Sequence, residues 1–63
     1  MFKYFNEIAD DGSTTTVAIN TAKLACAVPG QKENETILRF ENGGWFVVEG
    51  SQLDIVARLN TKE

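Results

Sequence analysis

Cys26 is the only cysteine of the chain and the side chain best suited to nucleophilic chemistry. A nucleophile needs a base to activate it, and the chain contains no histidine. The alternation of residues 24–28 predicts a strand with Cys26 on its inward face, between two alanines. We therefore expect Cys26 to be a small buried hydrophobe, and we predict that the protein is not an enzyme and has no catalytic residue.

Asp10 and Asp11, with the nearby Glu7, could in principle hold a divalent cation. They lack the ligand number and spacing of a calcium loop, and one cysteine without histidine makes a zinc site improbable. Aspartate in a turn usually bonds its own backbone. Gly43-Gly44 lacks the lysine and hydroxyl residue of a phosphate loop. We expect turn chemistry at both places, with no metal and no cofactor.

Trp45 is the residue whose role the sequence leaves open. Successive residues of a strand point to opposite faces, so residues 45–48 are apolar on both sides, with Trp45 and Val47 on one side and Phe46 and Val48 on the other. One interpretation places Trp45 in the core of the chain. A second makes it an interface anchor, because Trp is enriched at binding hot spots. A third makes it a stacking platform for nucleic-acid bases.

Length and charge limit these choices. The 63 residues are enough for a single small domain, residues 1–63, which buries only roughly 60% of the surface of its unfolded chain. We therefore expect self-association into a homo-oligomer, most simply a dimer. The alternative is association with an unknown protein partner. The net charge is −3 and the six basic residues are scattered. Proteins that bind phosphates usually carry a basic patch, so nucleic acid is an unlikely partner.

The secondary-structure elements are predicted from turn and capping residues and from the periodicity of apolar residues. Asn42-Gly43 predicts a tight two-residue hairpin turn between two β-rich segments, and Asp11-Gly12 marks another turn. Ser51, with an acidic residue three positions later, predicts a helix N-terminus. The predicted strands are 2–8, 14–19, 24–28, 36–40 and 45–48. The fold class is α+β: a small curled antiparallel sheet of about five strands, like a β-roll or barrel, with one C-terminal helix.

The strand that ends in Val48 is apolar on both faces, and one helix can cover only one of them. The other face must pack on the first hairpin or on another chain. The candidate interface residues are Trp45, Val47, Phe2, Tyr4 and Phe5. We expect residues 29–35, which begin with Pro-Gly, to form a mobile loop, and residues 60–63 to be a frayed tail.

From residue 19 onward the pattern resembles a known family. The segments that carry the resemblance are Ile19-Asn20, Leu24, Thr36-Ile37-Leu38-Arg39-Phe40-Glu41-Asn42-Gly43, Phe46-Val47-Val48 and the helix that begins at Ser51. They are similar to segments of the small FlbD-type (swarming motility) proteins of bacteria and phages. A looser similarity exists to the LytTR DNA-binding domain. The resemblance implies this architecture and a bacterial or phage context. It supplies no catalytic residue.

The first residues, Met1 to Phe5, are too short an apolar run for a signal peptide, and no run approaches the length of a membrane span. A lone cysteine suits a reducing cytosol. We therefore expect a small cytoplasmic, non-catalytic interaction or regulatory protein with no membrane partner. The alternative is a regulator that binds nucleic acid.

Overall fold

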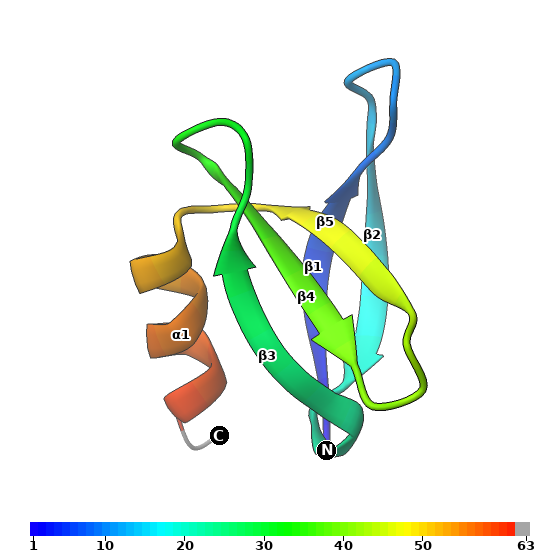
Figure 1. Ribbon diagram of the computed structural model, residues 1–63, viewed down its shortest axis with the longest axis vertical. Coiled ribbons are helices and arrows are strands. Elements are labelled where there is room, and N and C mark those ends of the chain that lie inside the picture. Colours follow the sequence, from blue (N-terminus) through cyan, green and yellow to red (C-terminus); the bar gives the residue numbers. More distant parts are fainter. Residues whose placement is uncertain (62–63) are drawn as a thin grey trace.

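The computed structural model describes residues 1–61, which form one antiparallel sheet and one helix (Figure 1). The elements in chain order are β1 (Phe2–Ile8), β2 (Thr14–Asn20), a short 3₁₀ turn η1 (Thr21–Lys23), β3 (Leu24–Pro29), β4 (Glu35–Phe40), β5 (Trp45–Glu49) and α1 (Gln52–Asn60). The five strands lie in the order β2-β1-β5-β4-β3. The predicted α+β class is therefore confirmed. The sheet is open, with β2 and β3 at its edges.

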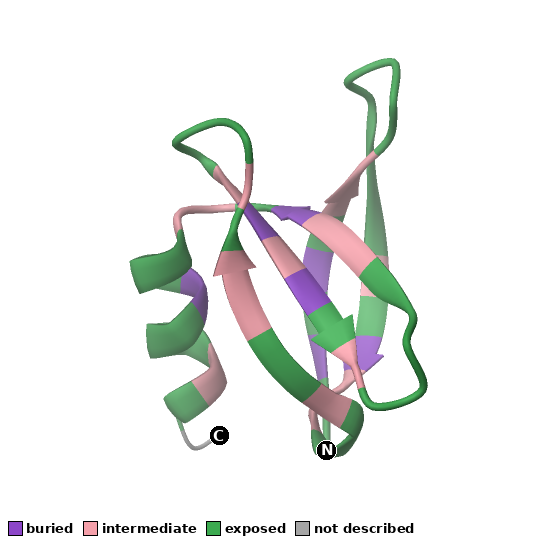
Figure 2. Cartoon of the chain, viewed as in Figure 1, coloured by how far each residue is buried: buried purple, intermediate pink, exposed green. Residues whose placement is uncertain are grey.

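The sheet is strongly curled, so that the β1–β2 hairpin lies behind β4 and β5 in the view of Figure 1, and α1 stands beside β3. β1 meets β5 at one register position, Glu7 opposite Val48. The core fills the space inside the curl, where the buried residues of Figure 2 gather. Its fully covered members come from both halves of the sheet and from the helix: Phe5, Ile19, Leu38, Val48 and Ile55. We call the side of the sheet that carries these residues the inner face, and the opposite side the outer face.

The β4–β5 turn is one residue longer than the sequence predicted. The N–H of Gly43 donates to the carbonyl of Phe40 at 3.0 Å, and the N–H of Phe40 donates to the carbonyl of Gly44 at 2.9 Å. Gly43 has φ +92°, while Asn42 does not have a positive φ. This is a three-residue loop in which only the glycine adopts the left-handed conformation. Asn42 instead accepts a bond from the N–H of Gly44 at 2.8 Å.

The prediction that Cys26 points inward is wrong, and a β-bulge is the reason. Leu24 pairs with Phe40, yet Cys26 pairs with the next residue back, Arg39. Ala25 is therefore an extra residue in β3, and an extra residue exchanges the two faces of the strand beyond it. Cys26 is consequently exposed on the outer face. Sequence alternation alone could not reveal the exchange, because the bulged residue is an ordinary alanine.

The loop between β3 and β4 is shorter than the predicted 29–35. Pro29 is the last residue of β3, where it pairs with Thr36, and Glu35 already belongs to β4. Proline cannot donate to a ladder, so a strand end at the edge of a sheet is a position that tolerates it. The N–H of Gly30 donates to the carbonyl of Glu35 at 3.0 Å and closes the loop. Its mobility stays a prediction.

Helix α1 begins as predicted. The Ser51 hydroxyl accepts a bond from the N–H of Asp54 at 3.2 Å, which satisfies one of the free donors of the first turn. Only a narrow stripe of the helix is covered: Ile55 is buried and Leu59 is half-buried, whereas Leu53 is 81% exposed. Of the predicted frayed tail, Asn60 is the last helical residue and residues 62–63 lie outside the described residues.

Two cationic side chains attach the end of α1 to β1. Lys3 lies on the inner face, only 5% exposed, and its Nζ donates to the carbonyls of Arg58 and Thr61. A cation at this position satisfies terminal carbonyls and complements the negative end of the helix dipole. The Arg58 guanidinium lies over the ring of Phe5, 4.4 Å from its centroid, and donates to the carbonyl of Tyr4. These contacts hold the helix across the opening of the curled sheet.

Candidate functional site

Trp45 lies on the outer face of β5 and is 62% exposed. Its neighbour Phe46 points inward, where its ring meets that of Phe40 edge-on with centroids 5.7 Å apart. Val48 is fully buried on the same inner face. The predicted division of β5 into two apolar faces is therefore confirmed. The interpretation of Trp45 as a core residue is wrong, since only the inner face is covered by the chain itself.

An aliphatic row crosses the outer face beside Trp45. Val47 pairs with Ile37 on β4, and Ile37 pairs with Val28 on β3. The register between Glu7 and Val48 places Ile8 next to Val47 on the other side. All four side chains are half-buried. We call Ile8, Val47, Ile37 and Val28 the aliphatic row, and the row together with Trp45 the outer patch.

The two sides of the aliphatic row carry opposite charge. On one side, Trp45 pairs with Arg39. On the other side, Glu35 pairs with Glu49, and the amide of Asn6 donates to Glu49 Oε1 at 3.2 Å. Like charges directly opposite one another on neighbouring strands are unfavourable. The outer patch is thus an apolar band with a cationic rim and an anionic rim.

Shallow hollows flank the indole of Trp45. One is lined by Ile37, Arg39, Gly43 and Trp45. The other is lined by Gly30, Gln31, Glu35, Ile37, Trp45 and Val47. The indole ring of Trp45 therefore stands between two hollows. Side chains of a partner chain can occupy these hollows and enclose the ring, as happens around an interface anchor.

The remaining predicted interface residues lie elsewhere. Phe2 and Tyr4 are 64% and 67% exposed on the outer face of β1. Tyr4 lies four residues along β1 from Ile8, roughly 13 Å away at the rise of a strand, so it belongs to a separate surface. Phe5 is 2% exposed, because the alternation of β1 turns it into the core. Of the five candidates, only Trp45 and Val47 belong to the outer patch.

Sequence reasoning missed Ile8, Ile37 and Val28 as members of the outer patch. These residues come from three different strands, and each looks like an ordinary strand residue in its own segment. They form a row only through the register of β1, β5, β4 and β3. Alternation along a strand tells which residues share a face but not which residues of other strands lie beside them.

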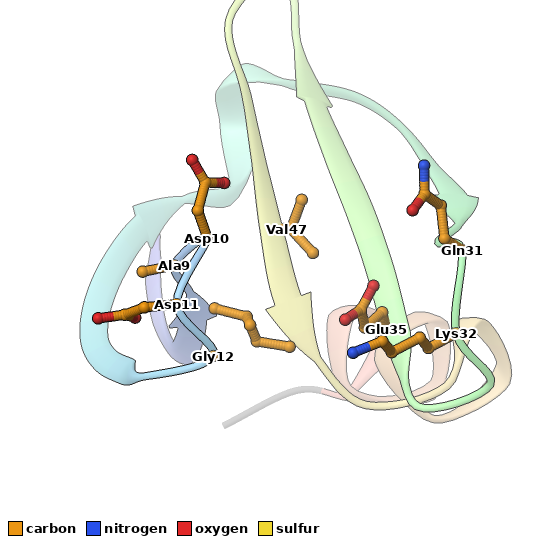
Figure 3. A pocket seen from close by; sticks show the side chains of 9 residues that line it. Ala9, Asp10, Asp11, Gly12, Gln31, Lys32, Glu35 and Val47 are labelled. Atoms are coloured by element: carbon orange, nitrogen blue, oxygen red, sulfur yellow. The ribbon is translucent and has the colours of Figure 1, made fainter.

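A groove opens at one end of the sheet, between the β1–β2 turn and the β3–β4 loop (Figure 3). Its volume is about 370 Å³ and Val47 lies at its floor. Asp10 and Asp11 stand on one wall, Lys32 and Glu35 on the other. Within residues 1–61, no three His, Cys, Asp or Glu side chains are grouped so that they could hold a metal ion.

The Asp11 carboxylate is occupied by its own turn. Its Oδ1 accepts the N–H of Ser13 at 2.9 Å and the hydroxyl of Ser13 at 2.6 Å. These hydrogen bonds, first the one from the hydroxyl, lower the pKa of Asp11 below its ordinary value, because they favour the ionised form. The predicted turn chemistry is confirmed for Asp11.

Replacing Ser13 by alanine should therefore raise the pKa of Asp11 toward its ordinary value. The lowered pKa also makes the turn most stable above the unfolded-state pKa of the carboxyl, with that stability lost as the pH falls through the folded-state value. NMR titration of the side-chain carboxyl resonances measures the change. An unchanged Asp11 titration in the Ser13→Ala variant would contradict the assigned cause.

Comparison with models of known protein families, with curated proteins and with solved structures gave no match to this chain. The resemblance to FlbD-type and LytTR proteins thus stays a prediction. No helix among the described residues is long and apolar enough to cross a membrane.

Proposed function

We propose that the protein is a small non-catalytic interaction protein that acts as a homo-oligomer, with the outer patch as its contact surface. The observation that carries the proposal is the exposure of Trp45, 62%, beside a half-buried aliphatic row. Tryptophan is strongly enriched among the residues that dominate binding energy. A small domain also gains stability from a partner subunit, since it buries a smaller share of its own surface than a large one.

A second copy of the chain is the occupant that the charge pattern favours. On β4, Arg39 and Glu35 stand on either side of Ile37; on β5, Trp45 and Glu49 stand on either side of Val47. A two-fold axis that runs along the aliphatic row sets row against row. It also brings Arg39 of one copy to the acidic rim of the other, where it relieves the repulsion between Glu35 and Glu49.

The resemblance to FlbD-type proteins supports a setting in a bacterium or phage, and the lone cysteine supports the reducing cytoplasm. The alternative, a regulator that binds nucleic acid, is less favoured by this surface. Arg39 is the basic residue beside Trp45, whereas Glu35 and Glu49 line the opposite rim. Phosphate backbones require a basic surface, so binding of mixed DNA and RNA at low salt is the result that would favour the alternative.

Replacing Trp45 and Val47 by serine in one variant should weaken self-association by about tenfold or more, because an anchor residue and the centre of the apolar band are removed together. Sedimentation equilibrium over the micromolar range measures the average mass against the 7.0 kDa of one chain. The emission of the wild-type protein should shift to shorter wavelength as concentration rises, since Trp45 is the only tryptophan.

The matched control is Tyr4→Ser, which removes a similarly exposed aromatic ring, 67% exposed, from outside the outer patch. It should self-associate as the wild type does. A wild-type protein that remains one chain at high micromolar concentration would overturn the proposal. So would a Trp45→Ser/Val47→Ser variant with the oligomer mass of the wild type.

A further inference from the structure

The two edges of the sheet differ in how they are protected. β3 carries a bulge after Leu24 and ends in Pro29, and the side-chain amide of Gln52 donates to the carbonyl of Ala27 at 3.0 Å. Bulges, prolines and a covering helix are the devices by which proteins prevent an edge strand from pairing with another chain. β3 therefore has the features of a closed edge.

β2 has none of these features. Its sequence, TTTVAIN, contains no charged residue and no proline, and its register with β1 runs from Phe2 opposite Asn20 to Ile8 opposite Thr14 without a bulge. The strand is seven residues long, whereas strands in globular proteins most often have about five or six residues. A straight, uncharged edge of this kind is a template for strand addition.

The hydrogen bonds at both ends of β2 show which of its backbone groups are free of β1. Ser13 accepts the N–H of Ala9 at 2.8 Å, and Thr21 donates to the carbonyl of Met1 at 2.9 Å. In an antiparallel pair every second residue bonds to its neighbour strand, so the odd-numbered residues from 13 to 21 direct their N–H and C=O groups toward β1. The residues between them direct their N–H and C=O groups away from the sheet: Thr14, Thr16, Ala18 and Asn20.

We propose that this edge pairs with β2 of a second copy, antiparallel, with Val17 of each chain on the two-fold axis. Thr16 then faces Ala18 of the second copy and exchanges both backbone bonds with it. The carbonyl of Thr14 accepts the N–H of Asn20 of the second copy, whose own carbonyl begins the 3₁₀ turn η1. The two valines form a close non-hydrogen-bonded pair on the inner face. The two five-stranded sheets become one continuous sheet.

Charge around β2 supports a second copy in this orientation. Every cross-strand pair in the proposed register is uncharged, so no like charges oppose each other. The acidic residues Asp10 and Asp11 precede β2, and Lys23 follows it. Antiparallel pairing brings the acidic end of one strand to the basic end of the other, whereas parallel pairing would align like charges.

This contact goes beyond the proposed function, because it uses a different surface from the outer patch. A two-fold axis perpendicular to the sheet leaves both outer faces on the same side and both outer patches uncovered. A chain with two separate self-contacts joins dimers into larger assemblies. Each contact can therefore be removed without the other.

The test is a charge exchange across the proposed axis. Thr16→Lys/Ala18→Lys sets lysine against lysine, and Thr16→Glu/Ala18→Glu sets glutamate against glutamate. Each variant alone should therefore have an affinity for itself through the edge that is lower by about tenfold or more. Mixing the two should restore the edge contact as a heterodimer. Both are made with Trp45→Ser/Val47→Ser, so that the outer patch contributes nothing, and native mass spectrometry identifies the species.

The control variant is Leu53→Lys/Asn60→Lys in the same background. It adds the same charge as the lysine variant at two exposed helix positions and should leave the edge contact intact.

A second measurement needs no substitution. The Thr16 and Ala18 amide protons of the wild type should exchange slowly at high protein concentration and rapidly on dilution. Lysine and glutamate variants that do not combine, or amide exchange independent of concentration, would overturn the edge contact. Neither result would bear on the outer patch.

Discussion

Replacing Leu38 by alanine is expected to lower the free energy of unfolding by about 2–5 kcal/mol, the usual cost of removing a buried leucine. Leu38 is fully buried near the middle of β4, in one core cluster with Phe5 and Ile19 of the β1–β2 hairpin and Ile55 of the helix. A domain of this length has a total stability of roughly 3–9 kcal/mol. The substitution should therefore remove a large share of the total stability.

Urea denaturation followed by circular dichroism at 222 nm measures the loss. Leu53→Ala is the matched control: the same atoms are removed from a side chain that is 81% exposed, so the change should stay within about 0.5 kcal/mol. Equal losses in the two variants would show that the core does not lie where the structure places it.

Replacing Lys3 by methionine is expected to cost about 1–3 kcal/mol, because the buried lysine no longer supplies a charged donor to two partly buried carbonyls. The Nζ of Lys3 donates to the carbonyls of Arg58 and Thr61, which close the last turn of α1. Methionine fills most of the space of the lysine stem but offers no donor. The last turn of the helix should therefore loosen more than its first turn, which the Ser51 cap holds.

Amide hydrogen exchange of Leu59, Asn60 and Thr61 reports the local effect, and urea denaturation reports the global one. The control is Lys23→Met, an exposed lysine whose loss should change the stability by less than about 0.5 kcal/mol. Unchanged exchange at the end of α1 in the Lys3 variant would contradict the role assigned to this side chain.

The candidate site could be predicted from the sequence less completely than the strands and the helix could. Sequence alone placed Trp45 and Val47 on one face of β5, but it could not decide between core and surface for that face. The decision rests on the curl of the sheet, which brings Phe5 and Ile19 of the β1–β2 hairpin against the inner side of β5 and β4. Alternation in the sequence separates Phe5 from Phe2 and Tyr4, but only the structure decides that the face of Phe5 is the core and the other face is exposed.

The buried position of Lys3 could not be predicted from the sequence either. A lysine in a strand is normally expected at the surface, with its ammonium group in water. Here the carbonyls at the end of a helix far along the chain provide its partners. No local pattern of residues 2–8 could reveal a partner that lies more than fifty positions away.

The sequence by itself determined the strands, the turn glycines and the start of the helix, because alternation, positive φ at glycine and helix capping act between residues close in the chain. Only the tertiary structure decided that Cys26 faces outward, that the aliphatic row exists, and which edge of the sheet is left open. Each of these depends on register between strands. Register is set by contacts between distant segments, and a single bulge is enough to change it.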